Sequence, residues 1–343
     1  MEYQRLGTSG LKVSKIILGC MSYGSSKWQD WVLDEEKALP LLKAAYDAGI
    51  NTWDTADMYS NGVSETIIGK AITKYNIPRK KLVVMTKCFC GVNEEDPSSL
   101  NHRSTTGEWV NQTGLSRKHI FDAVDASVAR LGTYIDVLQI HRFDPETPPE
   151  EIMEALHDVV KSGKVRYIGA STMWAHEFAT LQFTATLHGW TKFISMQNYY
   201  NLAYREEERE VIPFCNKTGV GLIPWSPVAR GLLARPYAQE TVRSNTDGYY
   251  KILYGAGKAA KTREAAIDEE VVGRIEKVAK DKGVPMAGVA IAWVVSKGCA
   301  PIVGLSSEKR IQEAIDALKI KLTPEEVKFL EDAYEPKKVQ GNY

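Results

Sequence analysis

Short runs of apolar and β-branched residues alternate along the chain with stretches in which the apolar positions recur every three or four residues. Eight runs are candidates for buried strands: residues 15–19, 51–54, 82–86, 135–140, 165–170, 192–196, 220–223 and 300–304. The stretch 35–48 places apolar residues at i, i+3, i+4 and i+7, which predicts a helix with one apolar face. Comparable helical stretches cover residues 64–75, 116–131, 149–161, 176–188, 205–217, 268–282 and 307–318.

An eightfold strand–helix alternation predicts a parallel sheet closed into a (β/α)8 barrel, the TIM-barrel fold. The main alternative is an open, doubly wound sheet. Two observations count against it, because no Gly-x-Gly-x-x-Gly follows any of the runs and no change in composition marks a linker. We therefore expect a single barrel domain over residues 1–343.

Four segments lie outside the alternation. Residues 1–13 contain two short extended runs around a Gly-rich turn, which predicts an N-terminal β-hairpin that plugs the bottom of the barrel. Residues 88–115 and 226–265 follow the third and seventh runs and are longer than ordinary loops, so they would overhang the rim where barrel active sites form. Residues 323–343 begin with Thr-Pro-Glu-Glu, which predicts an extra C-terminal helix before a polar tail.

Composition narrows the class of protein. Hydrophobic residues make up 44% and charged residues 25%, which excludes a disordered chain. Lys and Arg number 43, as do Asp and Glu, so the basic excess of a nucleic-acid or polybasic membrane binder is missing. The chain shows neither a secretory signal nor a stretch of about 18 apolar residues. Its five cysteines form no CxxC pair, and we expect free thiols in a cytoplasmic protein without membrane insertion.

Ionisable residues of three types close three successive runs. Asp54 ends the second run, Lys87 follows the third and His141 follows the fourth, while Tyr59 lies five residues beyond Asp54. Adjacent strands are about 4.8 Å apart, so these side chains can converge on one rim. Each residue alone has an ordinary structural explanation, such as a helix cap or a packed side chain. A metal site is not expected, because a lysine ammonium cannot be a ligand.

The four side chains suggest a division of labour in carbonyl reduction. A carbonyl that receives a hydride becomes an alkoxide and needs a proton, which Tyr59 can supply. We expect Lys87 to lower the pKa of that phenol, and Asp54 to keep Lys87 charged and in place. His141 can orient the carbonyl and stabilise the developing oxyanion. The reverse reaction, alcohol oxidation, would use Tyr59 as the base.

At these residues the sequence resembles the aldo-keto reductases, in particular their aryl-alcohol dehydrogenase-like members and the β subunits of voltage-gated potassium channels. The matching segments follow the family order over nearly the whole chain: residues 51–65 (NTWDTADMYSNGVSE), 85–87 (MTK), 140–141 (IH), 168–171 (IGAS), 196–201 (MQNYYN), 224–227 (PWSP) with 231–233 (GLL), and 303–307 (VGLSS). The resemblance implies a barrel that binds NADPH without a Rossmann domain. It also implies a small-molecule aldehyde or ketone substrate, aromatic or bulky, and a catalytic tetrad of Asp54, Tyr59, Lys87 and His141.

The resemblance also implies the cofactor contacts, position by position. At the nicotinamide end these are Cys20, Met21, Asp54, Ser171, Thr172, Gln197 and Trp225, whose ring would stack on the nicotinamide. Along the pyrophosphate they are Ser226, Pro227, Val228 and Arg230. At the adenosine end they are Gly304, Ser306, Arg310 and Glu313, where the guanidinium of Arg310 would bind the 2′-phosphate of NADPH with help from Arg243.

Three departures from the family pattern bear on affinity and specificity rather than on the reaction. Thr172 stands where most members have Asn, Ala314 replaces a common Asn, and Met21 replaces a common Trp. Other aromatic residues, Trp28 and Trp31 among them, are expected first in the core or a lid and second as substrate contacts. The remaining histidines, including His102, are expected at the surface or on helix faces.

Two alternatives to an enzyme of this kind stay open. The first is an NADPH-binding, redox-sensing regulatory subunit of a partner protein, because the tetrad is intact in the channel β subunits too. The second is a phosphate-binding barrel aldolase or isomerase with Lys87 as a Schiff base, against which the Asp54–Tyr59 arrangement argues. The sequence specifies neither the physiological substrate nor the oligomeric state, and it leaves a homo-oligomer possible.

Overall fold

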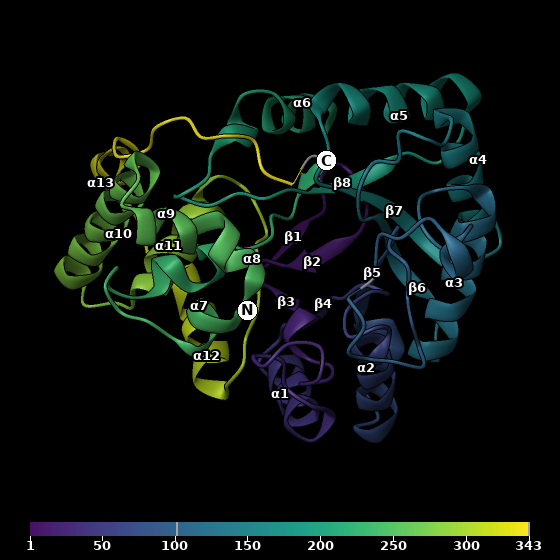
Figure 1. The fold of residues 1–343 in the computed structure, drawn as a ribbon, viewed down its shortest axis with the longest axis horizontal. Coiled ribbons are helices and arrows are strands. Elements are labelled where there is room, and N and C mark those ends of the chain that lie inside the picture. The colour runs from purple at the N-terminus through teal and green to yellow at the C-terminus, as the bar shows by residue number, and fades with distance from the viewer. Residues whose placement is uncertain (101, 342–343) are drawn as a thin grey trace.

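The computed structural model describes residues 1–100 and 102–341, and within them it confirms the predicted barrel. Eight parallel strands form one sheet in the order β10-β3-β4-β5-β6-β7-β8-β9 (Figure 1). The ring closes between the two ends of this order, where the amides of Ala300 and Ile302 donate to the carbonyls of Leu222 and Pro224 at 3.0 and 2.9 Å. The strands are β3 (Ile17–Gly19), β4 (Thr52–Asp54), β5 (Val83–Cys88), β6 (Ile135–Ile140), β7 (Val165–Ser171), β8 (Phe193–Gln197), β9 (Gly221–Leu222) and β10 (Ile302–Val303).

Helices surround the strands, and their ends follow local sequence signals (Figure 1). Ser116 caps α3 by accepting a hydrogen bond from the amide of His119, and Gly132 ends this helix in the left-handed conformation at φ 65°. The helix predicted over 205–217 starts later, at Val211, because Glu206–Glu208 form a 3₁₀ turn. The helices that follow the first six barrel strands are α1 (Glu35–Asp47), α2 (Val63–Lys74), α3 (Arg117–Leu131), α4 (Pro149–Lys161), α5 (Ala175–His188) and α6 (Val211–Thr218).

Two long helices, rather than the single one predicted over 268–282, connect β9 to β10. They are α10 (Arg263–Lys282) and α11 (Met286–Ser296). The sequence of α11, MAGVAIAWVVS, is apolar on every side, and seven consecutive residues from Gly288 to Val294 are buried. A helix buried all round carries no amphipathic stripe, which is why its periodicity gives no signal. The remaining barrel helix is α12 (Glu308–Asp316), and the predicted extra C-terminal helix is α13 (Pro324–Glu331).

The predicted hairpin of β1 (Tyr3–Arg5) and β2 (Lys12–Ser14) is present and lies across the centre of the ring of helices (Figure 1), at the end of the barrel where β4 begins. The amide of Ser14 donates to Oγ1 of Thr52, the first residue of β4, at 3.1 Å. Leu6 and Val13 are buried in one cluster with side chains from inside the barrel. The hairpin therefore closes this end and leaves the opposite rim open.

The two long loops lie at that opposite rim, as predicted. The first holds a 3₁₀ turn at Gly107–Trp109. The second contains the short helices α7 (Val242–Thr246), α8 (Gly248–Tyr250) and α9 (Ala256–Ala260). None of the helices in the described part of the chain combines the length and apolar character needed to cross a bilayer.

Candidate active site

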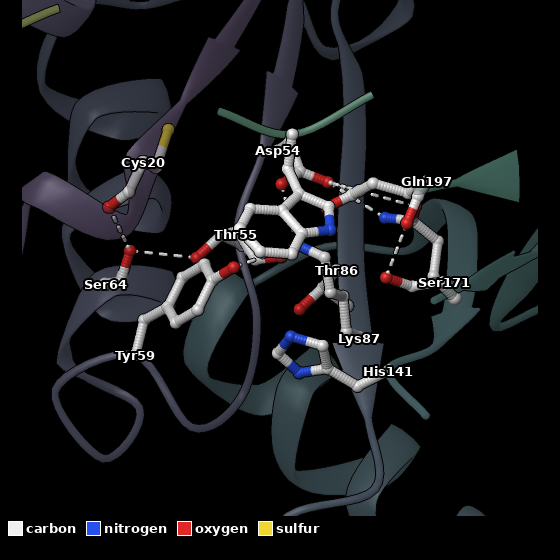
Figure 2. Close-up of polar contacts among 12 residues, drawn as sticks. Cys20, Asp54, Thr55, Tyr59, Ser64, Thr86, Lys87, His141, Ser171 and Gln197 are labelled. Atoms are coloured by element: carbon white, nitrogen blue, oxygen red, sulfur yellow. Dashed lines mark hydrogen bonds and ion pairs between the residues drawn. The ribbon is translucent and has the colours of Figure 1, made fainter. Parts of the chain in front are cut away.

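The four predicted catalytic side chains converge at the open rim (Figure 2). Asp54 ends β4, Lys87 is the penultimate residue of β5, His141 follows β6, and Tyr59 lies in the connection from β4 to α2. The ammonium of Lys87 lies 2.6 Å from Oδ2 of Asp54 and donates to the hydroxyl of Tyr59 at 3.3 Å. The rings of Tyr59 and His141 meet edge to face at 6.0 Å between centroids.

Strand register explains why these side chains meet. In the parallel pairing, Asp54 lies opposite Met85, and Lys87 lies opposite Gln139. Oδ1 of Asp54 accepts two further hydrogen bonds at 2.9 Å, from the amide groups of Gln139 and Gln197. Gln139 was not predicted as a site residue, although its place two residues before His141 puts it on the same inward face as His141. Both oxygens of Asp54 are thus fixed, and the carboxylate cannot rotate away from Lys87.

Lys87 is fully buried, and each of its three ammonium protons has an acceptor. Besides Asp54 and Tyr59, it donates to the carbonyl of Thr55 at 2.7 Å. Burial acts to lower the pKa of Lys87, but the negative charge of Asp54 and the contact with Tyr59 outweigh it and raise the pKa. The side chain is therefore a fixed cation beside the phenol.

Lys87 lowers the pKa of Tyr59, as expected, but the net pKa of this phenol is raised. Burial raises the pKa of Tyr59 more than the positive charge of Lys87 lowers it, and Asp54 adds to the rise. The phenol consequently keeps its proton at neutral pH. Lys87 limits this rise in the pKa of Tyr59. Loss of the hydroxyl proton therefore costs less free energy than at an equally buried tyrosine without a neighbouring cation.

His141 is held in its neutral form. Burial lowers the pKa of this imidazole well below its usual 6.5, and the positive charges of Arg142 and Lys87 lower it further. Its Nδ1 is buried and has no hydrogen-bond partner among the described residues. A neutral imidazole offers one N–H donor and one acceptor, so His141 can orient a substrate oxygen without bringing a second cation to the site.

A cavity of about 960 Å³ opens above the tetrad, at the upper end of the range typical of ligand sites. Fourteen of the sixteen predicted cofactor residues line it: Met21, Asp54, Ser171, Gln197, Trp225, Ser226, Pro227, Val228, Arg230, Arg243, Gly304, Ser306, Arg310 and Glu313. Cys20 and Thr172 do not. The thiol of Cys20 is completely buried and points to the carbonyl of Leu18, and Thr172 lies behind Trp225.

Trp225 is held rigidly in the cavity wall. Its indole stacks on the ring of Tyr199 at 4.3 Å, and Tyr199 stacks in turn on Tyr204 at 4.6 Å. The indole N–H donates to Oγ1 of Thr172 at 3.0 Å. Because Trp225 also lines the cavity, this aromatic surface suits a flat heterocycle such as nicotinamide.

The arginines farther along the cavity fall into two groups. Arg230 and Arg243 both form ion pairs with the buried carboxylate of Asp247, at 2.5 and 3.0 Å, which sequence reasoning did not foresee. Arg235 and Arg310 have no carboxylate partner within the described ranges, and the positive charge of Arg310 adds to burial in lowering the pKa of Arg235. Two unpaired guanidiniums close together at the start of α12 suit a doubly charged phosphate.

Several side chains on the substrate side of the cavity were not predicted as site residues. The prediction that His102 lies at the surface is wrong, because its side chain is buried. One ring nitrogen accepts from the indole of Trp28 at 3.3 Å, and the other lies 3.1 Å from the carbonyl of Gly91. Trp28, Trp31 and Arg142 also line the cavity. All three lie in loops, where no periodicity marks inward positions, and the two tryptophans were expected only second as substrate contacts.

Comparisons with known proteins agree with this geometry. The sequence profile of the Aldo/keto reductase family matches residues 15–335. "Versiconal hemiacetal acetate reductase" of Aspergillus parasiticus is 60% identical over 99% of this chain and 98% of its own length. "Aldo-keto reductase AFTS1" of Alternaria alternata is 53% identical over 99% of this chain and 93% of its own length. "Putative aryl-alcohol dehydrogenase AAD16" of Saccharomyces cerevisiae is 53% identical over 97% of both chains.

Proposed function

The chain belongs to the aldo/keto reductase family, and from this premise we propose that it is an NADPH-dependent reductase of aromatic or bulky aldehydes and ketones. Family membership and the reductase names of its relatives indicate an oxidoreductase that acts on small carbonyl compounds with NAD(P)H. The observation that carries the finer proposal is the buried hydrogen-bonded chain from Asp54 through Lys87 to Tyr59 at the floor of the cavity.

In this proposal the tetrad handles the proton of the reaction. NADPH, when bound, supplies the hydride. Tyr59 donates its hydroxyl proton to the carbonyl oxygen, and the ammonium of Lys87 at 3.3 Å stabilises the phenolate that remains. Asp54 keeps Lys87 charged, and neutral His141 orients the carbonyl. Ser171 and Gln197 would hold the carboxamide of the nicotinamide, and Trp225 would stack on its ring.

The preference for NADPH over NADH rests on charge at the far end of the cavity. Arg235 and Arg310 lie without a carboxylate partner among residues that the structure describes, beside the N-terminus of α12. With NADPH bound, the negative charge of the 2′-phosphate would neutralise these two guanidiniums. With NADH bound, which lacks that phosphate, both would keep their charge without a counter-ion. The aromatic or bulky substrate class rests on Trp28, Trp31 and Tyr249 in the wall, and on the names of the relatives.

The test is Tyr59→Phe, which removes the proton donor and keeps the ring. We expect kcat for benzaldehyde reduction, followed as loss of NADPH absorbance, to fall by about 100-fold or more, since general acid catalysis contributes about 10²–10⁴-fold. NADPH binding, measured by fluorescence titration, should persist. Tyr75→Phe is the matched control, because Tyr75 also lies near a lysine, Lys74, but ends α2 outside the cavity.

Two results would contradict the proposal. Turnover by Tyr59→Phe within a few-fold of the unmodified protein would remove Tyr59 as the acid. Tight NADPH binding without turnover of any aromatic or aliphatic aldehyde or ketone in a broad panel would instead favour an NADPH-binding regulatory subunit.

A further inference from the structure

Arg142 stands out among the cavity side chains because the tetrad does not use it. It follows His141 directly at the end of β6 and is half-buried in the cavity wall. One guanidinium nitrogen donates to the carbonyl of His141 at 2.5 Å. Its Nε, by contrast, is completely buried and has no hydrogen-bond partner in the described structure. A buried donor without a partner needs a physical explanation, and in the wall of a ligand cavity a bound group can supply the missing acceptor.

The positive charge of Arg142 lacks a counter-ion, just as its Nε lacks a hydrogen-bond acceptor. Among the carboxylates whose side chains the structure describes, none forms an ion pair with it, whereas Arg230 and Arg243 in the same cavity share Asp247. Burial lowers the pKa of Arg142, and the like charge of Arg103 lowers it further, although Tyr249 and Cys90 oppose this. Burying part of a cation without a counter-ion is costly, so Arg142 attracts an anion, and the exposed Arg103 adds positive charge at the same cavity wall.

The phosphates of the proposed cofactor do not supply that anion. They would lie along the loop after β9 and the start of α12, where Ser226, Arg230 and Arg310 line the cavity. Arg142 follows β6, a strand that β7 and β8 separate from β9 in the sheet. Its electrostatic neighbours include Tyr59 and the imidazole of His141, which are at the reacting end of the site. The positive charge at this end thus faces the substrate.

We propose that Arg142, assisted by Arg103, binds an oxyanion of the substrate, so that the preferred substrates are aromatic carbonyl compounds carrying a carboxylate or an ionised phenol. The inference rests on the proposed function and names its substrate class. A guanidinium can donate two parallel hydrogen bonds to a carboxylate, which fixes orientation as well as adding affinity. Trp28 and Trp31, which line the same part of the cavity, would hold the ring that joins the oxyanion to the carbonyl.

The experiment compares acids with their neutral esters. The substrates are 3- and 4-carboxybenzaldehyde and the corresponding methyl esters, at a pH where both acids are ionised. We expect kcat/KM to favour at least one acid over its ester by about tenfold or more in the unmodified protein, the size of one charge-assisted hydrogen bond. Arg142→Gln should reduce this acid-to-ester ratio by at least tenfold. The control is Arg166→Gln. Arg166 lies near the first residue of β7, at the end of the strand away from the cavity, so its loss removes one positive charge as well but should leave the ratio unchanged.

Binding separates this inference from the proposed function. The Kd values of 3- and 4-carboxybenzyl alcohol and of their methyl esters, measured by calorimetry with NADP⁺ present, need no turnover. Preferential binding of an acid that Arg142→Gln abolishes would support the oxyanion site even if the protein reduced none of the aldehydes. Equal binding of acid and ester by the unmodified protein, or equal losses for both in Arg142→Gln, would overturn it, because a purely structural role of Arg142 would affect both alike.

Discussion

At the scale of single residues, what distinguishes the arginines of the cavity is the partner that each one has. Asp247 neutralises much of the charge of Arg230 and Arg243, so these two can meet a pyrophosphate without leaving a large excess of positive charge. Arg310 instead donates to the hydroxyl of Ser306 at 2.6 Å, a neutral group that keeps the guanidinium in place. Its full charge therefore remains available to a ligand.

This difference predicts the effect of Arg310→Ala on cofactor choice. The Kd for NADPH should rise by about tenfold or more, because a hydrogen bond between charged groups contributes about 1.5–3 kcal/mol, and the Kd for NADH should change much less. Fluorescence titration with both cofactors measures this. Lys309→Ala removes the adjacent, exposed cation of α12 and serves as the control. Equal losses of NADPH and NADH affinity in Arg310→Ala would show that it does not read the 2′-phosphate.

At the scale of elements, the sequence was informative wherever one periodicity dominated. Strand ends could be predicted because apolar runs stop at polar residues, and this is how Asp54, Lys87 and His141 were found. Helix α11 was missed because burial on all sides removes its polar face. The long loops were recognised by their length and by the strands that they follow, which places them at the rim but does not tell which loop side chains, such as His102 and Arg142, line the cavity. Their positions depend on tertiary contacts, such as the hydrogen bond between Trp28 and His102.

The close packing of the N-terminal hairpin against the barrel predicts a loss of stability when Gly7 is replaced. Gly7 has φ +59°, and a Cβ there would lie 2.3 Å from the carbonyl oxygen of Gly219 and 2.5 Å from the amide nitrogen of Gly221. Gly7→Ala should therefore lift the hairpin from the barrel and lower the free energy of unfolding by about 2 kcal/mol or more. Gly10→Ala in the same turn region meets no atom within 4 Å and is the matched control. Urea denaturation measures both, and equal midpoints would contradict a tightly packed plug.

At the scale of the whole molecule, the closed barrel unites a site that is scattered along the sequence. Tyr59 and Lys87 come from the first third of the chain, Trp225 from the second half and Arg310 from near its end. Closure through the hydrogen bonds between β9 and β10 brings the proposed cofactor wall next to β3 and β4. The same compact packing also buries acidic groups that have no role in the tetrad, and these affect the stability of the molecule.

Glu207 predicts a pH dependence of that stability. It lies in the 3₁₀ turn before α6, where burial raises its pKa from 4.5 to about 8. The nearby Asn198 side chain opposes this rise, and the negative charge of Glu206 adds to it. Its Oε2 is buried and has no partner among the residues described. Between these two pKa values the folded protein holds a proton that the unfolded chain has lost. Unfolding therefore releases a proton, and the stability falls as the pH rises through this window.

Glu207→Gln, which is neutral at every pH, should remove this loss. The difference in unfolding free energy between variant and unmodified protein should grow in favour of the variant from about pH 5 to about pH 8, by on the order of 4 kcal/mol, and then level off. Urea denaturation at a series of pH values measures it, with Glu210→Gln, in an exposed position of the same segment, as the control. A difference that stays constant between pH 5 and 9 would mean that Glu207 is charged in the folded protein, which the absence of a partner for its buried oxygen makes unfavourable.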